Sequence, residues 1–252
     1  MRAGFRQWRL AAALARLDIR NRYRGSVLGP LWLTLSTAVT IAGVGLVFSG
    51  VFGLPLAEYL PFLAVSLLIW NMLNLIVQDA CGNFIGAEGI IRQMPLPYTI
   101  HVLRCLFRNA LVAAHNLPLI VLVFAMFGLL PGPQALLSLL GLALIALTAF
   151  ALALLLGMIC ARFRDVQQIV ASVMQLAFLL SPIIWKPELL QGRIAWLYAN
   201  PIYVLLETVR GPLLGTGAPL SIWLTALAYT AVCCAAAAAF FVRFRARIAF
   251  WV

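Results

Sequence analysis

Long runs without a charged side chain constrain this sequence more than any other feature. Asp, Glu, Lys and Arg are absent from residues 25–57, 59–78, 109–161, 166–185 and 211–242. A bilayer core about 30 Å thick needs about 20 apolar residues for each crossing helix. The run at 109–161 is long enough for two crossings and is divided by the turn signal GLLPGP at 128–133. The sequence therefore predicts an all-α membrane protein with six transmembrane helices.

The basic residues predict how these helices are oriented. Six crossings place both termini on one side, and 15 of the 18 basic residues fall on that side: Arg2, Arg6, Arg9, Arg16, Arg20, Arg22, Arg24, Arg92, Arg104, Arg108, Arg162, Arg164, Arg243, Arg245 and Arg247. Only Lys186, Arg193 and Arg210 fall on the other side. Because short cytoplasmic segments of membrane proteins are rich in Lys and Arg, the first side is predicted to be cytoplasmic. The net charge of +11 is better explained by topology and anionic lipids than by nucleic-acid binding.

Three segments of the single domain (residues 1–252) lie outside the predicted spans. Residues 4–24 mix apolar and Arg positions, which predicts an amphipathic interfacial helix, either an orientation anchor or a substrate contact. Residues 79–108 form a cytoplasmic loop that contains a short semi-apolar helix at 83–92. Residues 186–220 are external but apolar, and the Asn200-Pro201 break favours re-entrant helices over a plain hydrophobic cap.

Missing motifs narrow the classes of function. The sequence has no G-x-x-x-x-G-K-S/T motif and its one lysine, Lys186, is external, so this chain is not predicted to bind ATP through a P-loop. The spans lack the buried carboxylates of ion-driven carriers, and neither H-E-x-x-H nor G-x-S-x-G occurs. His115 with Asn116 favours interhelical hydrogen bonding over a proton relay. The five cysteines lack metal-ligand spacing. The prediction is a permease that is not an enzyme, powered by another subunit.

Five segments, in order along the chain, resemble the ABC-2 type export permeases. Residues 22–32, RYRGSVLGPLW, resemble the opening R-Y-R/K-x-S-x-L-G-x-x-W, and 90–97, IIRQMPLP, resemble the coupling helix and its proline turn. Residues 161–166, ARFRDV, match the turn between spans four and five. Residues 200–215, NPIYVLLETVRGPLLG, and 247–252, RIAFWV, are similar to the last segments of polysaccharide exporters, closest to those for O-antigen. The two prolines of the second segment are closer together here than in many members.

The resemblance implies a homodimer in the bacterial inner membrane that works with two copies of a separate ATP-binding subunit. ATP and Mg would be bound by that subunit, with no cofactor on this chain. The cargo would be a polysaccharide on a polyprenyl pyrophosphate lipid. The open alternatives are an ABC-2 permease for another lipid-linked glycan or a drug and, from a different class, a membrane enzyme acting on lipid-linked sugars.

The same resemblance suggests roles for three groups of residues. ATPase coupling is assigned to the loop helix and the turn between spans four and five: Phe84, Ile85, Glu88, Ile90, Ile91, Arg92, Arg162, Arg164 and Asp165. A salt bridge from Asp165 to a loop arginine is also expected. Binding of the substrate headgroup is assigned to Arg20, Arg22 and Arg24, since guanidinium groups suit phosphate geometry. Channel aromatics, which could instead form an ordinary interfacial belt, are Phe52, Tyr59, Phe178, Trp185 and Tyr198.

Overall fold

The computed structural model of the chain describes residues 2–27, 29, 31–94, 96–190 and 195–252, and regular structure there is helical. The α-helices are α1 (Arg2–Arg6), α2 (Trp8–Arg22), α3 (Leu31–Phe52), α4 (Leu56–Gly82), α5 (Glu88–Gln93), α6 (Tyr98–Met126), α7 (Leu137–Arg162), α8 (Asp165–Leu180), α9 (Pro201–Leu213), α10 (Leu220–Phe244) and α11 (Ile248–Trp251). Short 3-10 helices are η1 (Ile85–Ala87), η2 (Pro133–Leu136), η3 (Pro187–Leu190), η4 (Ala195–Ala199) and η5 (Arg245–Arg247). Pro30, Pro95 and Arg193, which the sequence predictions used, lie outside the described residues.

Each predicted crossing segment contains one helix. Five of these are long and apolar enough to cross a membrane: α3, α4, α6, α7 with η2, and α10. The sixth, α8, has 16 residues and is therefore about 24 Å long. It ends where Ser181 turns to an extended conformation before Pro182. The prediction of an all-α, multi-span membrane protein is confirmed, with α8 the shortest of the six helices.

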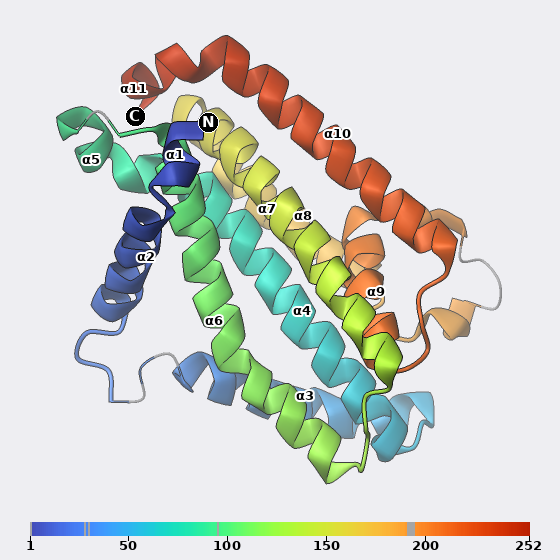
Figure 1. Cartoon of the computed structure of the whole chain (residues 1–252). Helices are drawn as coiled ribbons and strands as arrows, with labels where there is room; N and C mark the ends of the chain where they lie inside the picture. Colours follow the sequence, from blue (N-terminus) through green and yellow to red (C-terminus); the bar gives the residue numbers. More distant parts are fainter. Residues whose placement is uncertain (1, 28, 30, 95, 191–194) are drawn as a thin grey trace.

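The non-spanning basic segments gather at one end of the bundle. Figure 1 shows α1, α5, α11, the turn between α7 and α8, and both chain termini at the upper left, with α2 running down the left side from there. We call this the arginine-rich end. The turns from α3 to α4 and from α6 to α7 lie at the opposite end (Figure 1). This arrangement agrees with the prediction that both termini share a side.

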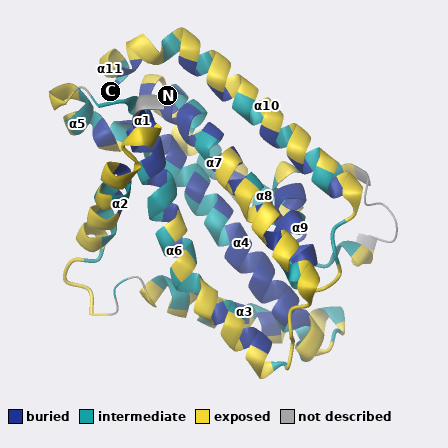
Figure 2. Cartoon of the chain, in the orientation of Figure 1, coloured by how far each residue is buried: buried dark blue, intermediate teal, exposed yellow. Residues whose placement is uncertain are grey.

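The core is built around α4 and α9, which Figure 2 shows as the most continuously buried helices. α9 packs against α7 so closely that a Cβ on Gly141 would lie 2.6 Å from the Thr208 carbonyl oxygen. The start of α9 is fixed by Asn200, whose side-chain oxygen accepts from the Ile202 amide at 3.0 Å. Pro201 follows at the first helical position, where its missing N–H costs nothing. The Asn-Pro break predicted from sequence therefore separates η4 from α9.

Two predicted segments differ in extent from the helices observed. α4 continues to Gly82 and α6 already begins at Tyr98, so only residues 83–97 of the predicted loop at 79–108 connect the two helices. Within it, η1 and α5 occupy the place of the short helix predicted at 83–92. Of the segment at 186–220, α9 is buried in the bundle and does not form a surface cap.

The N-terminal segment is helical, as predicted, but it also packs on the bundle. Ala11 and Ala15 of α2 are fully buried, and Ala11 packs with Ile100 and Leu103 of α6. Small residues on this face of α2 let the two helices approach closely. The large apolar side chains Trp8 and Leu17 remain about half exposed, as expected of a helix that also contacts the bilayer interface.

Candidate functional site

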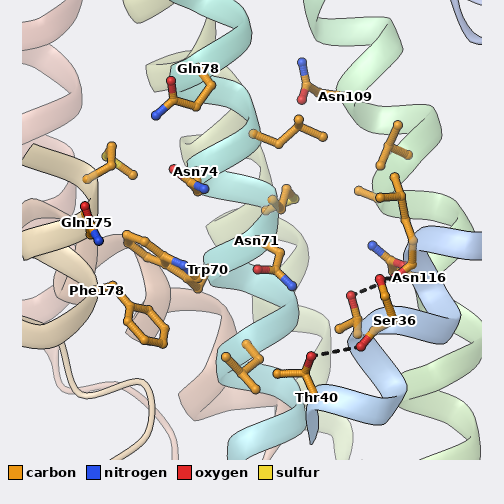
Figure 3. Close-up of a pocket in the computed structure, with 18 of the residues that line it drawn as sticks. Ser36, Thr40, Trp70, Asn71, Asn74, Gln78, Asn109, Asn116, Gln175 and Phe178 are labelled. Atoms are coloured by element: carbon orange, nitrogen blue, oxygen red, sulfur yellow. Dashed lines mark hydrogen bonds between the residues drawn. The ribbon is translucent and has the colours of Figure 1, made fainter. Parts of the chain in front are cut away.

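A groove of about 650 Å³ runs between α3, α4, α6 and α8 (Figure 3). It is lined by amides, hydroxyls, two aromatic rings and aliphatic side chains. The polar and aromatic lining residues are Ser36, Thr37, Thr40, Trp70, Asn71, Asn74, Gln78, Asn109, Asn116, Gln175 and Phe178. None of the described lining residues is charged.

Three of the amides form a row on α4. Asn71, Asn74 and Gln78 are spaced three and four residues apart, which places them on one face of a helix. Figure 3 shows them along the groove, with Gln175 of α8 opposite. These four amides make no hydrogen bond with any described residue. Asn71, Asn74 and Gln78 are half-buried and Gln175 is exposed, so their amides are free to exchange hydrogen bonds with groups that enter the groove.

The sequence predictions missed this row, although its signal was present. The lack of charge at residues 59–78 predicts a membrane span, and amides do not interrupt a charge-free run. Three amides at helical spacing within an apolar span would have indicated a polar face.

An aromatic pair lies beside the amides. The rings of Trp70 on α4 and Phe178 on α8 have centroids 5.4 Å apart and are tilted by 46°. Phe178 was predicted as a channel aromatic, and the structure places it in the wall of the groove. Trp70 was not predicted. Together the two rings give the groove one broad apolar surface among its polar groups.

The other four predicted channel aromatics lie away from the groove. Phe52 and Tyr59 pack edge to face at 6.0 Å near the turn between α3 and α4. Tyr59 is fully buried and its hydroxyl donates to the Ile184 carbonyl at 2.7 Å, so its ring has no exposed surface in this chain. The Trp185 indole donates to the Leu179 carbonyl, and the Tyr198 hydroxyl is 3.1 Å from that of Ser221. Channel roles for these four residues stay predictions.

Asn116 joins the groove to α3. The Thr34 hydroxyl lies 2.9 Å from the Asn116 side-chain oxygen and 3.0 Å from the His115 carbonyl. The His115 ring contacts its own helix, with Nδ1 2.6 Å from the Leu111 carbonyl. The interhelical hydrogen bonding predicted for this pair is therefore made by the Asn116 side chain and the His115 carbonyl, while the His115 ring bonds within α6.

An ion network closes the groove at the arginine-rich end. Arg104 binds Asp18 of α2 through two hydrogen bonds, and Arg108 bridges Asp18 and Asp79 with N–O distances of 3.2 and 2.8 Å. The four side chains are 13–19% exposed. The Asn109 amide, which lines the groove, donates to Asp79 at 3.0 Å. The network thus fixes α2 to α6 and to the end of α4.

This environment shifts the titration of Asp18. Burial by itself raises the pKa of this carboxyl, but hydrogen bonds and charge from Arg104, with the charge of Arg108, outweigh it and hold the pKa below the usual 3.8. Asp18 is therefore ionised at neutral pH.

Of the three arginines predicted to bind the substrate headgroup, only Arg22 lies close to this network. Arg22 lies 3.8 Å from Asp79 and its side chain is 42% exposed. Arg20 and Arg24 are exposed and make no ion pair with a described residue. The more enclosed cations, Arg104 and Arg108, were counted from sequence as orientation signals and no binding role was predicted for them.

The segment predicted to couple to an ATPase is exposed in part. Phe84 is fully buried, 6.0 Å edge to face from Tyr98, and packs against Gly157 of α7. In α5, Arg92 pairs with Glu88 at 2.9 Å and donates to the Val252 main-chain oxygen at 2.5 Å. Ile85, Ile90 and Ile91 are half-buried. Ile85 and Ile91 pack against the buried cluster that includes Ile248 of α11 and Val252, and the hydrogen bond from Arg92 to Val252 joins α5 to the end of the chain.

The turn between α7 and α8 lies at the same end of the bundle (Figure 1). Arg162, Arg164 and Asp165 are exposed, and the Arg162 guanidinium lies 5.3 Å from the Phe163 ring centroid. The expected salt bridge is wrong: Asp165 pairs with no arginine of the described residues. It occupies the first turn of α8 instead, where a negative charge interacts favourably with the helix dipole.

Arg210 of α9 is buried, although the sequence prediction counted it among external charges. It is 2% exposed and its guanidinium donates to Glu207, to the Ser66 hydroxyl at 2.9 Å and to the Pro182 carbonyl at 2.6 Å. It also lies 4.5 Å from the Phe62 ring centroid. This one side chain ties α9 to α4 and to the turn after α8. No group of three metal-binding side chains occurs in the described ranges.

Comparison with known proteins agrees with this architecture. Residues 9–214 match the family model for the ABC-2 type transporter. An O-antigen export system permease protein RfbA from Klebsiella pneumoniae is 22% identical over 206 residues, covering 80% of this chain and 78% of the relative. A protein of the same name from Myxococcus xanthus is 26% identical over 205 residues, with the same coverage of both chains.

Proposed function

Because the chain belongs to the ABC-2 type transporter family, we propose that it is the permease of an exporter for a lipid-linked polysaccharide of the O-antigen type. The observation that carries the proposal is the uncharged groove, where four unpaired amides face the same space as the Trp70–Phe178 pair. Sugar hydroxyls exchange hydrogen bonds with amides, and the apolar faces of sugar rings pack on aromatic rings. Charged side chains in the groove would bind a neutral polymer no better than amides do, and they would keep water molecules bound there. The names of the relatives support this cargo.

We further propose that two copies of the chain work with two ATP-binding subunits in the bacterial inner membrane. The half-exposed coupling residues of α5 would receive the ATP-binding subunit, and ATP and Mg would be bound there. The concentration of arginines at one end of the bundle supports cytoplasmic termini. The polymer would enter from that end, attached to its polyprenyl pyrophosphate lipid.

Reconstitution tests the proposal. Purified permease and its ATP-binding subunit are placed in vesicles with a lipid-linked polysaccharide, and ATP-dependent appearance of the polymer on the far side is measured with a lectin. The wild type is expected to translocate, and the double variant Asn71→Leu/Asn74→Leu to translocate at least tenfold more slowly with ATP-binding subunits still attached.

The matched control is Ser172→Ala, an exposed position of α8 that does not line the groove, which should translocate like the wild type. Transport of a drug without transport of the polysaccharide would favour the alternative cargo and contradict the proposal. An Asn71→Leu/Asn74→Leu variant with normal transport would remove the groove from the path.

A further inference from the structure

A second, smaller cavity lies between the end of α4, η1 and α6. Its volume is about 50 Å³, and it is lined by Gly82, Asn83, Gly86, His101, Arg104, Cys105 and Arg108. His101 is 1% exposed, yet neither of its ring nitrogens has a hydrogen-bond partner among the described residues. A buried imidazole without a partner is costly, so this cavity calls for an occupant that can hydrogen-bond.

The cavity is rich in donors and positively charged. Nη1 of Arg104 makes no hydrogen bond with a described residue, since Asp18 takes only Nε and Nη2. Arg108 also borders the space. The surrounding network contains three arginines, including Arg22, and only two aspartates. Each arginine has an aspartate within 4 Å, but three positive charges against two negative ones leave the network with a net charge of +1, which favours an anion over a neutral occupant.

Two glycines leave this side of the cavity open. A Cβ added to Gly82 or Gly86 would meet no other atom within 4 Å, and Gly86 is exposed at the arginine-rich end. A cavity needs only about 10–15 Å³ for each water, so 50 Å³ holds a small cluster of waters or one group of similar size. A single phosphate group is of that size.

The cavity and the groove share one face of α6. His101, Arg104 and Arg108 line the cavity, while Asn109 and Asn116 continue into the groove at helical spacing. Asp79 links the two, because it accepts from both Arg108 and Asn109. The cavity is therefore the charged end of an otherwise uncharged path.

We propose that this cavity binds a phosphate group, held by Arg104, Arg108 and the His101 ring, and that it positions the phosphate of the cargo at the entrance to the groove. The inference rests on the proposed function only for the source of the phosphate. A cargo has a diphosphate at one end and sugars beyond it. The diphosphate would reach Arg104 and Arg108 first, and the sugars would then lie beside the amides of the groove, in the order of these residues along α6.

Thermal unfolding tests the site with defined probes. The full-length permease with its ATP-binding subunit, in phosphatidylcholine nanodiscs, is titrated with inorganic phosphate and with farnesyl diphosphate, and with chloride at equal ionic strength. We expect a saturable rise in Tm with farnesyl diphosphate that chloride does not reproduce. A similar rise with inorganic phosphate shows that the site also admits free phosphate, whereas its absence assigns the site to the lipid headgroup.

Two variants remove the site in different ways. His101→Leu removes the unpaired ring, and Gly86→Val places a branched side chain at the open side of the cavity without touching a hydrogen bond. In both variants, the concentration of farnesyl diphosphate that gives half of the maximal rise in Tm should be at least tenfold higher than in the wild type. Since His101→Leu removes an unsatisfied polar group, it should unfold no earlier than the wild type without ligand. His115→Leu, on the same helix but away from the cavity, should respond like the wild type.

The inference is overturned if farnesyl diphosphate gives no saturable rise, or if both site variants respond like the wild type. These outcomes are independent of the proposed function, which fails only if the wild-type complex does not translocate the polysaccharide.

Discussion

Asp18 and Arg104 are joined by two hydrogen bonds, Nε to Oδ2 at 2.7 Å and Nη2 to Oδ1 at 2.5 Å, across the contact between α2 and α6. The two residues are 86 positions apart in sequence. Because each side chain is less than a fifth exposed, this pair acts as an anchor for α2 and is more than a screened surface contact.

Asp18→Asn should loosen α2. The substitution keeps the size of the side chain but leaves Arg104 without a charged partner and Arg108 with Asp79 alone, and hydrogen bonds to charged groups contribute about 1.5–3 kcal/mol each. We expect a loss of stability of that order in thermal unfolding of the purified protein. Arg16→Gln, an exposed position on the same helix, should stay within about 0.5 kcal/mol of the wild type; equal losses in both variants would argue against the anchor.

The anchor should also depend on pH. The pKa of Asp18 is lowered in the folded protein, so its contribution is complete above the unfolded pKa of about 3.8 and is lost as the pH falls through the lower folded value. Hydrogen exchange of residues 8–22, corrected for intrinsic rates, should therefore accelerate below about pH 3.8. The Asp18→Asn variant should lack this step. A step that persists in Asp18→Asn would assign it to another group.

Phe84 should behave as a core residue. It is fully buried and close to Gly157, so Phe84→Ala should destabilise the protein by about 3–5 kcal/mol. Met94, which follows α5 and is 52% exposed, is the better probe of docking. Met94→Asp should leave Tm nearly unchanged and reduce co-purification of the ATP-binding subunit. Unchanged co-purification in Met94→Asp would remove this end of α5 from the docking surface.

Arg210 should be indispensable to the packing of α9. Arg210→Met leaves the Glu207 carboxylate without its cation, and breaking a buried pair costs about 3–5 kcal/mol. The double variant Glu207→Gln/Arg210→Met should recover part of that loss, because no buried charge remains. Thermal unfolding of the two single variants and the double variant measures the coupling. Additive losses would show that the two charges do not interact.

The sequence predicted well the features that depend on polarity averaged over a whole helix, namely the number and the position of the apolar helices. Five charge-free runs, one of them divided by a turn, correspond to six helices, and the turn signals at residues 128–133 and at Asn200-Pro201 fall between helices. It predicted poorly whatever depends on which face a side chain occupies. Phe84, which was assigned to ATPase coupling, and Tyr59, which was assigned to the channel, are both fully buried in this chain, and average polarity does not show which face of a helix a residue occupies.

The site itself was recovered only in part. Phe178 lines the groove, but the amides at positions 71, 74, 78 and 175 were not predicted, because uncharged side chains do not interrupt a charge-free run. Asp18, Asp79, Arg104 and Arg108 are far apart in sequence, and only the packing of α2, α4 and α6 brings them together. Such long-range pairings leave no local pattern in a single sequence.

The central claim is that the polysaccharide passes along the groove, and a photo-cross-linker placed at Asn74 tests it most directly. With p-benzoylphenylalanine at position 74, polysaccharide should be captured during ATP-driven transport. The same probe at Val232, which is 66% exposed on α10, should capture lipid and no polysaccharide. Capture of polysaccharide at position 232 and none at position 74, in a complex that still transports, would contradict the account.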